Sequence, residues 1–142
     1  MNKQKGFTII ELIVVIAIIA VLAAIVMVNV TQYIGKSKDA AIKANLDTIR
    51  TNAAVYMSDQ EKGNGDFGGF LATAEYTIPA AAVATQTGTI TKNCNDTAGT
   101  CVDNTATKFC VSSTLASSAT TIYCIDGDGK VGTAVCAAGV CP

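Results

Sequence analysis

The strongest pattern along the chain is an unbroken apolar run near its amino terminus. A short basic head ends at Gly6, and every side chain from Leu12 to Val28 is apolar. One acid, Glu11, lies at the start of the run. Because a helix rises about 1.5 Å per residue, a helix over residues 7–34 is long enough to cross a hydrocarbon core. The pattern predicts a membrane-spanning helix over 7–34.

A second pattern follows directly, with apolar residues at alternating spacings of four and three. This spacing places their side chains on one stripe of a helix, and most nearby charges fall off the stripe. The two patterns predict one long helix that ends near Ser58, with a first half buried in membrane or among other helices and a second half packed against a sheet. The stripe consists of Ile42, Leu46, Ile49, Ala53 and Tyr56.

Beyond the helix, residues 59–93 are rich in Gly, Ala and Thr. We expect a variable connection there, with one short strand at 76–78 that is stopped by Pro79. Further strands are predicted at 108–115, 120–125 and 130–135, the last two joined by the strong Asp-Gly-Asp-Gly turn at 126–129.

The fold class expected is therefore α+β. A long amino-terminal α-helix packs on a small antiparallel sheet of three or four strands. We expect three parts: a leader at 1–6, the apolar helix at 7–34 and a globular domain at 35–142. Within that domain, 35–58 is the amphipathic helical half and 94–142 is a cysteine-rich sheet.

Composition argues against catalysis and against a nucleic-acid partner. The 142 residues include no histidine and no nucleophile with a base partner, so an enzyme is not expected. From Thr51 onward the chain has four lysines and eight acids, a net charge of −4. DNA binding needs a basic patch, which folding could still build from Lys92 and Lys108.

The leader junction resembles a known family. Residues 5–13 read KGFTIIELI, which is closely similar to the leader of type IV pilins and pseudopilins. The likeness joins a glycine, a following phenylalanine, a glutamate five residues after the glycine and an unbroken apolar helix. It covers residues 1 to about 60. The resemblance implies that a prepilin peptidase cleaves after Gly6 and methylates the new amino terminus at Phe7.

Glu11 has its own physical argument. An ionisable side chain inside a lipid-spanning helix is costly and is expected to have a partner. The amine that cleavage exposes on Phe7 of a neighbouring subunit would remove both desolvation penalties and set the register between subunits. The alternative is that Glu11 lies at the membrane interface, where its cost is small.

Six cysteines lie in the last third of the chain, which an exported segment would oxidise to disulfides. Their connectivity is open from sequence alone. We favour nearest-neighbour pairs, because Cys110 and Cys124 can face each other across adjoining strands while the outer pairs close short loops. Zinc is the rival, but the spacings lack a CxxC pair. The predicted pairs are Cys94 with Cys101, Cys110 with Cys124, and Cys136 with Cys141.

No cofactor is otherwise indicated. Asp126 and Asp128 alternate as the first ligands of a calcium loop do, but the rest of such a loop is missing. A plain hairpin turn explains the same residues, and calcium is kept as the rival interpretation.

Lys3 and Lys5 place the amino terminus in the cytoplasm and the rest of the chain outside. We expect a single-pass membrane precursor that becomes a homopolymeric, extracellular type IV pilus. Its partners would be prepilin peptidase and an inner-membrane assembly platform with its motor. The alternatives are a periplasmic pseudopilin of a type II secretion system, a competence-type DNA-uptake pilin, and a single-span anchor that never polymerises.

Overall fold

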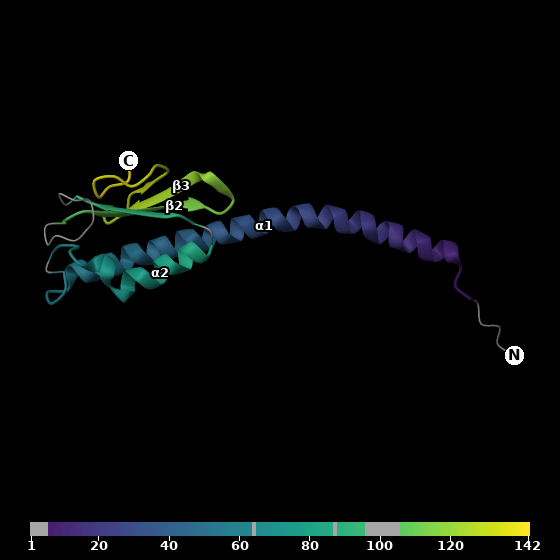
Figure 1. The fold of residues 1–142 in the computed structure, drawn as a ribbon, viewed down its shortest axis with the longest axis horizontal. Coiled ribbons are helices and arrows are strands. Elements are labelled where there is room, and N and C mark those ends of the chain that lie inside the picture. The colour runs from purple at the N-terminus through teal and green to yellow at the C-terminus, as the bar shows by residue number, and fades with distance from the viewer. Residues whose placement is uncertain (1–5, 64, 87, 96–105) are drawn as a thin grey trace. The chain divides into compact units, whose positions relative to one another are not determined.

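The computed structural model describes residues 6–63, 65–86, 88–95 and 106–142. The chain divides into two compact units, Met1–Ile34 and Gly35–Pro142, and each is described by itself. The fold is α+β, as predicted (Figure 1). The elements are α1 (Ile9–Ser58), the 3-10 helix η1 (Phe70–Ala72), α2 (Ala74–Thr85), and the strands β1 (Ile90–Cys94), β2 (Phe109–Leu115), β3 (Ser118–Asp126) and β4 (Val131–Gly132).

Helix α1 ends at Ser58, where its apolar period stops. All five residues of the predicted stripe are buried, four of them completely. They pack against side chains of β2 and β3, including Val111 and Ile125, in one core cluster. The amphipathic half of the helix is therefore held by the burial of its stripe rather than by intrinsic propensity.

Phe70 anchors the segment that follows α1. Its ring centroid lies 5.4 Å from that of Tyr56, 5.9 Å from Tyr76 and 5.5 Å from Phe109. The Tyr56 hydroxyl donates to the Gly68 carbonyl at 2.6 Å, so its polar tip is satisfied inside the core. These contacts connect α1, the turn before α2 and the sheet.

The strand predicted at 76–78 is wrong, because these residues belong to α2. Pro79 lies inside this helix and has no N–H to give to the carbonyl of Glu75, four residues earlier. That carbonyl instead accepts a hydrogen bond from the side-chain amide of Asn52 on α1, at 2.7 Å. A neighbouring helix thus supplies the donor that the proline removes, which the sequence around Pro79 does not reveal.

The sheet is a four-stranded antiparallel meander in the order β1-β2-β3-β4. Its first strand, β1, falls mostly within the segment that we expected to be a variable connection. The central strands match the predicted ones closely, and the turn at 126–129 joins β3 to β4 as predicted. β4 is shorter than the predicted strand at 130–135.

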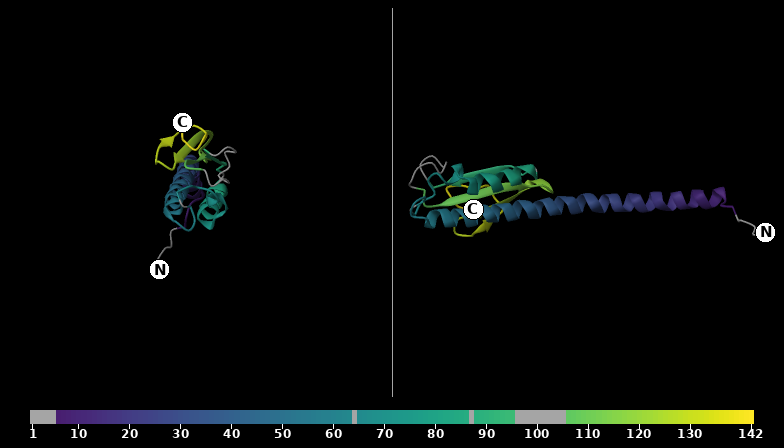
Figure 2. Two further views of the ribbon diagram at one scale, coloured as in Figure 1. Left: turned by 90° about the vertical axis from the view of Figure 1, so that its left-hand side faces the viewer. Right: turned by 90° about the horizontal axis from the view of Figure 1, so that it is seen from below.

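Both faces of the central strands are covered. Figure 2 shows α2 and the part of α1 from residue 35 side by side on one face, with the C-terminal tail (residues 133–142) on the other. Alternate residues of β2 join different clusters accordingly: Val111 is in the helix-side core, and Cys110 is in a cluster with cysteines of the tail. Six of the seven residues of β2 are buried for this reason.

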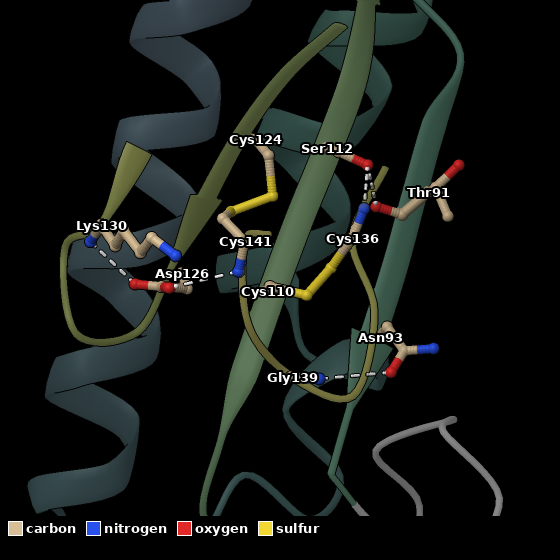
Figure 3. Close-up of a disulfide and its surroundings, with 10 residues drawn as sticks. All are labelled: Thr91, Asn93, Cys110, Ser112, Cys124, Asp126, Lys130, Cys136, Gly139 and Cys141. Carbon is tan, nitrogen blue, oxygen red and sulfur yellow. Dashed lines mark hydrogen bonds between the residues drawn. A yellow bond between two sulfur atoms is a disulfide. The ribbon is translucent and has the colours of Figure 1, made fainter. Parts of the chain in front are cut away.

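The predicted pairing of Cys110 with Cys124, and of Cys136 with Cys141, is wrong. The disulfides are Cys110–Cys136 and Cys124–Cys141, each with a Cα–Cα distance of 5.8 Å (Figure 3). The strand register explains this difference. Cys110 is opposite Asp126 and Cys124 is opposite Ser112, so the two strand cysteines are diagonal neighbours. Such neighbours have Cα atoms about 7–8 Å apart, beyond the usual reach of a disulfide.

The third predicted pair cannot be compared, because Cys101 lies outside the described residues. Cys94 is disulfide-bonded and buried in the helix-side core, apart from the separate cluster formed by Cys110, Cys124, Cys136 and Cys141.

Asp39 joins α1 to the turn between β2 and β3. Its carboxylate accepts hydrogen bonds from the Ser117 N–H at 2.9 Å and from the Ser117 hydroxyl. Partial burial raises the pKa of Asp39, but the hydrogen bonds from Ser117 and Ala116 and the nearby charge of Lys43 outweigh it and hold the pKa below its ordinary value of 3.8. The ionised carboxylate therefore stabilises the folded state.

We expect Asn52→Ala to lower the free energy of unfolding by about 1 kcal/mol, because the Glu75 carbonyl loses its donor. Pro79→Ala in the same background should recover much of this loss by supplying the missing N–H. Urea unfolding of the four chains in detergent micelles gives the coupling energy. Asn45→Ala is the matched control, since the Asn45 amide donates to the Ala41 carbonyl of its own helix rather than to another element of the described chain. Additive effects of the two substitutions would contradict this account.

We expect Asp39→Asn to lower the free energy of unfolding by roughly 1 kcal/mol at pH 7, a value reduced by solvent screening. A depressed pKa stabilises the fold above the ordinary pKa, and this contribution is lost as the pH falls through the folded-state pKa. The difference between the two chains should therefore shrink below pH 3.8. Asp47→Asn on the same helix is the control. A difference that does not change with pH would exclude the carboxylate charge as its source.

Candidate functional site

The junction between Gly6 and Phe7 lies in a segment directly before α1. Residues 6–8 are outside the helix, and Phe7 is 76% exposed. A Cβ atom built on Gly6 would meet no other group within 4 Å, and Gly6 does not have a positive φ. Neither the packing nor the backbone of the described chain therefore requires glycine at this position.

Thr8 and Glu11 form a reciprocal cap at the first turn of α1. The Glu11 carboxylate accepts from the Thr8 N–H at 2.8 Å and from the Thr8 hydroxyl at 2.7 Å. The Thr8 hydroxyl oxygen in turn accepts from the Glu11 N–H at 3.3 Å. This capping box satisfies amides that have no partner within the helix, and an acid there also complements the helix dipole.

The sequence predicted a partner for Glu11 on another chain, but the bond to Thr8 was not predicted. The signal was present, because a threonine three residues before a glutamate at the start of an apolar run is the capping-box pattern. The pairing of Glu11 with the amine of Phe7 on a neighbour stays a prediction.

The apolar half of α1 has no cover within the described part of the chain. The helix is long and apolar enough to cross a membrane, and none of its most apolar stretch is buried. Large side chains from Ile9 to Ile34 are about half exposed or more, on every side of the helix. Such a surface requires lipid or other helices around it.

Asp126 is a buried carboxylate with a structural explanation. One oxygen accepts from the Lys130 N–H at 2.8 Å, and the other accepts from the Cys141 N–H at 3.3 Å (Figure 3). It thus fixes both the β3–β4 turn and the end of the tail. Asp128 is exposed. Calcium binding by these two residues stays a prediction, and a cation would have to compete with both backbone donors for Asp126.

The cysteine cluster is not a metal site in this oxidation state. The sulfur atoms of Cys110, Cys124 and Cys136 lie within 4.8 Å of one another. All three are in disulfides, so none offers the thiolate that a metal binds.

Two exposed lysines of the globular unit have local partners. Lys62 lies 3.2 Å from the Glu75 carboxylate, whose hydrogen bond and charge raise the pKa of the lysine. The Lys92 ammonium lies 5.3 Å from the ring centroid of Tyr76. Both of these lysines therefore have a partner within the described part of the chain.

Comparison with known proteins bears on the amino-terminal segment. Residues 1–27 match the family model described as the prokaryotic N-terminal methylation motif. No solved structure matches the chain. The matched residues include the Gly6–Phe7 junction, the Thr8–Glu11 cap and most of the exposed apolar helix. The chain carries the class III prepilin leader of the type IV pilins and pseudopilins.

Proposed function

We propose that this chain is the structural subunit of a type IV pilus. The observation that carries the proposal is the arrangement at residues 6–11, where an accessible glycine junction directly precedes a capped apolar helix with an acid in its first turn. A peptidase can reach the junction, and the helix that remains after cleavage has the polar group needed for register. No catalytic constellation among the described residues competes with this role.

The glycine is explained by processing rather than by folding. Gly6 is neither packed against other groups nor in a glycine-only conformation. A requirement for glycine would therefore come from the pocket of the prepilin peptidase that reads the junction. Cleavage leaves Phe7 as the new amino terminus, which the same enzyme would methylate.

Assembly would change the partner of Glu11. In the single chain, the carboxylate is satisfied locally by Thr8. In the low dielectric of a helical core, a free amine on Phe7 of a neighbour would be a far stronger partner, because both groups are charged. The exchange of a neutral partner for a charged one favours one axial offset between subunits.

The exposed apolar half of α1 would pack against the same helix of other subunits in the filament core. A membrane would cover it before assembly, and the helices of neighbouring copies would cover it afterwards. The inner-membrane platform and motor would move the helix from one environment to the other. The globular unit would then form the filament surface, where its disulfides protect a small core.

A secretion pseudopilin shares the leader motif and is the main competing function. It differs in where the mature subunit is found: within the envelope rather than in fibres outside the cell. The net charge of −4 beyond residue 50 disfavours the DNA-uptake alternative.

The intact mass of the protein in sheared filaments and in washed membranes tests the proposed function. We expect a sheared species that begins at Phe7, carries one extra methyl group and lacks two hydrogens for each disulfide. Mature protein found only in the membrane would indicate a pseudopilin. Full-length protein that begins at Met1 and stays in the membrane would return the chain to the class of single-span anchors. Gly6→Leu should abolish the mature species, and its persistence would exclude this cleavage site.

We expect Glu11→Gln to reduce filament yield well over tenfold without reducing the amount of mature protein in the membrane. Glutamine keeps an oxygen that Thr8 can donate to, but it leaves the neighbour's amine as a buried, unpaired charge. The yield is measured by quantifying subunit in the sheared fraction. Glu61→Gln makes the same change at an exposed position beyond the helix and should assemble normally. Normal filaments from Glu11→Gln would exclude the charge pair.

A further inference from the structure

Four cysteines form one compact cluster under the C-terminal tail. Cys110 and Cys124 come from β2 and β3, and Cys136 and Cys141 come from the tail that lies over them (Figure 3). All four are 5% exposed or less. The sulfur atoms of Cys110, Cys124 and Cys136 lie within 4.8 Å of one another, although Cys110 and Cys124 are not bonded to each other.

The native bonds are interleaved along the chain. Cys110–Cys136 and Cys124–Cys141 span 26 and 17 residues, and each loop contains one cysteine of the other bond. The competing bonds, Cys110–Cys124 and Cys136–Cys141, join residues only 14 and 5 apart. Loop closure becomes less probable with about the three-halves power of loop length, so the unfolded chain favours the short bonds roughly 15-fold.

The direction of export adds to this bias. In the proposed function, on which this inference rests, the amino terminus stays in the cytoplasm and the rest of the chain crosses the membrane in sequence order. Cys110 and Cys124 then reach the oxidising compartment before either cysteine of the tail. A first bond between Cys110 and Cys124 is therefore favoured by the order in which the cysteines are exported and by the short loop that the bond closes.

The interleaved bonds tie the tail to the sheet, whereas the two short bonds do not. The tail also donates from the Cys136 N–H to the Ser112 hydroxyl at 3.2 Å, from the Gly139 N–H to Asn93 at 3.3 Å and from the Cys141 N–H to Asp126. The short bonds would leave this covering segment without a covalent link to β2 or β3. Native packing therefore favours the interleaved pairs, although chain statistics favour the others.

We infer that this chain is a client of an extracytoplasmic thiol–disulfide isomerase, which converts a Cys110–Cys124 intermediate to the native bonds. Every cysteine in the described part of the chain is bonded in the folded state, and the intermediate with the two short bonds also leaves no thiol in the cluster. The attacking thiolate is therefore supplied by another protein. The buried native disulfides are closed to such an attack, whereas an incompletely folded chain exposes the cluster.

The exchange balances without a net oxidant or reductant. The enzyme thiolate attacks the sulfur of Cys124, forms a mixed disulfide and releases the Cys110 thiolate. That thiolate attacks Cys136 in the Cys136–Cys141 bond, forms Cys110–Cys136 and releases the Cys141 thiolate. The Cys141 thiolate then attacks Cys124 in the mixed disulfide, which forms Cys124–Cys141 and returns the enzyme thiolate.

The chain's own lysines provide a direct readout. Trypsin cleavage after Lys108 and Lys130 yields one peptide, 109–130, with Cys110 and Cys124, and another, 131–142, with Cys136 and Cys141. Native bonds hold these two peptides together. The short bonds leave them separate, each with an internal disulfide. Fragmentation of the linked pair then assigns each bond.

The full reduced chain is oxidised in detergent micelles with oxidised glutathione, quenched at intervals with acid and a thiol-blocking reagent, and digested. We expect separate, internally bonded peptides first, followed by slow conversion to the linked pair. A catalytic amount of purified disulfide isomerase with reduced active-site thiols should speed that conversion roughly tenfold or more, while the same enzyme with its active-site cysteines replaced by alanine should not.

The double variant Cys110→Ser, Cys136→Ser is the matched control. It leaves Cys124 and Cys141 as the one pair within the cluster, so the isomerase should not change the rate at which their bond forms. Linked peptides as the first product of the unaltered chain, with no effect of the enzyme, would overturn the inference, and so would separate peptides that the enzyme fails to convert. Because the readout is a peptide mass, a failure of filament assembly would not affect it.

Discussion

The structure depends on how its apolar surfaces are covered. In the globular unit, β2 and β3 present apolar or thiol side chains on both faces, so two separate layers must pack against one small sheet. Helices α1 and α2 supply one layer through a stripe of aliphatic residues and a group of aromatic rings. The second layer is only the tail from residue 133, which is too short to form a core by itself. Two disulfides and a buried carboxylate hold it in place.

The apolar half of α1 faces the same requirement without a cover of its own. Its side chains are exposed around the whole helix, so the surface must be met by lipid or by other copies of the helix. The polar groups at its start fit this view, because Thr8 and Glu11 satisfy each other within one turn. Because its carboxylate has local hydrogen-bond donors, a single subunit can hold Glu11 in a membrane. The same carboxylate remains able to bind a stronger, charged partner in a filament.

Two positions show how distant segments supply what local sequence lacks. Pro79 removes a hydrogen bond from α2, and Asn52 of α1 replaces it from another helix. Asp39 of α1 holds the Ser117 turn, 78 residues away in sequence. Both contacts are polar and lie at the edges of the core, where they orient elements that hydrophobic burial alone would leave free to slide.

Periodicity in the sequence determined the long helix, its buried stripe and its end at Ser58, and the turn residues at 126–129 determined the hairpin. Each of these features depends on neighbours within a few residues. The leader junction could also be read from sequence, since its motif is one contiguous run of residues. Only the tertiary structure decided that residues 76–78 are helical, that β1 joins the sheet, and that Cys110 and Cys124 bond to the tail instead of to each other. These outcomes depend on strand register and on long-range partners, which place residues distant in sequence beside one another and outweigh local propensity.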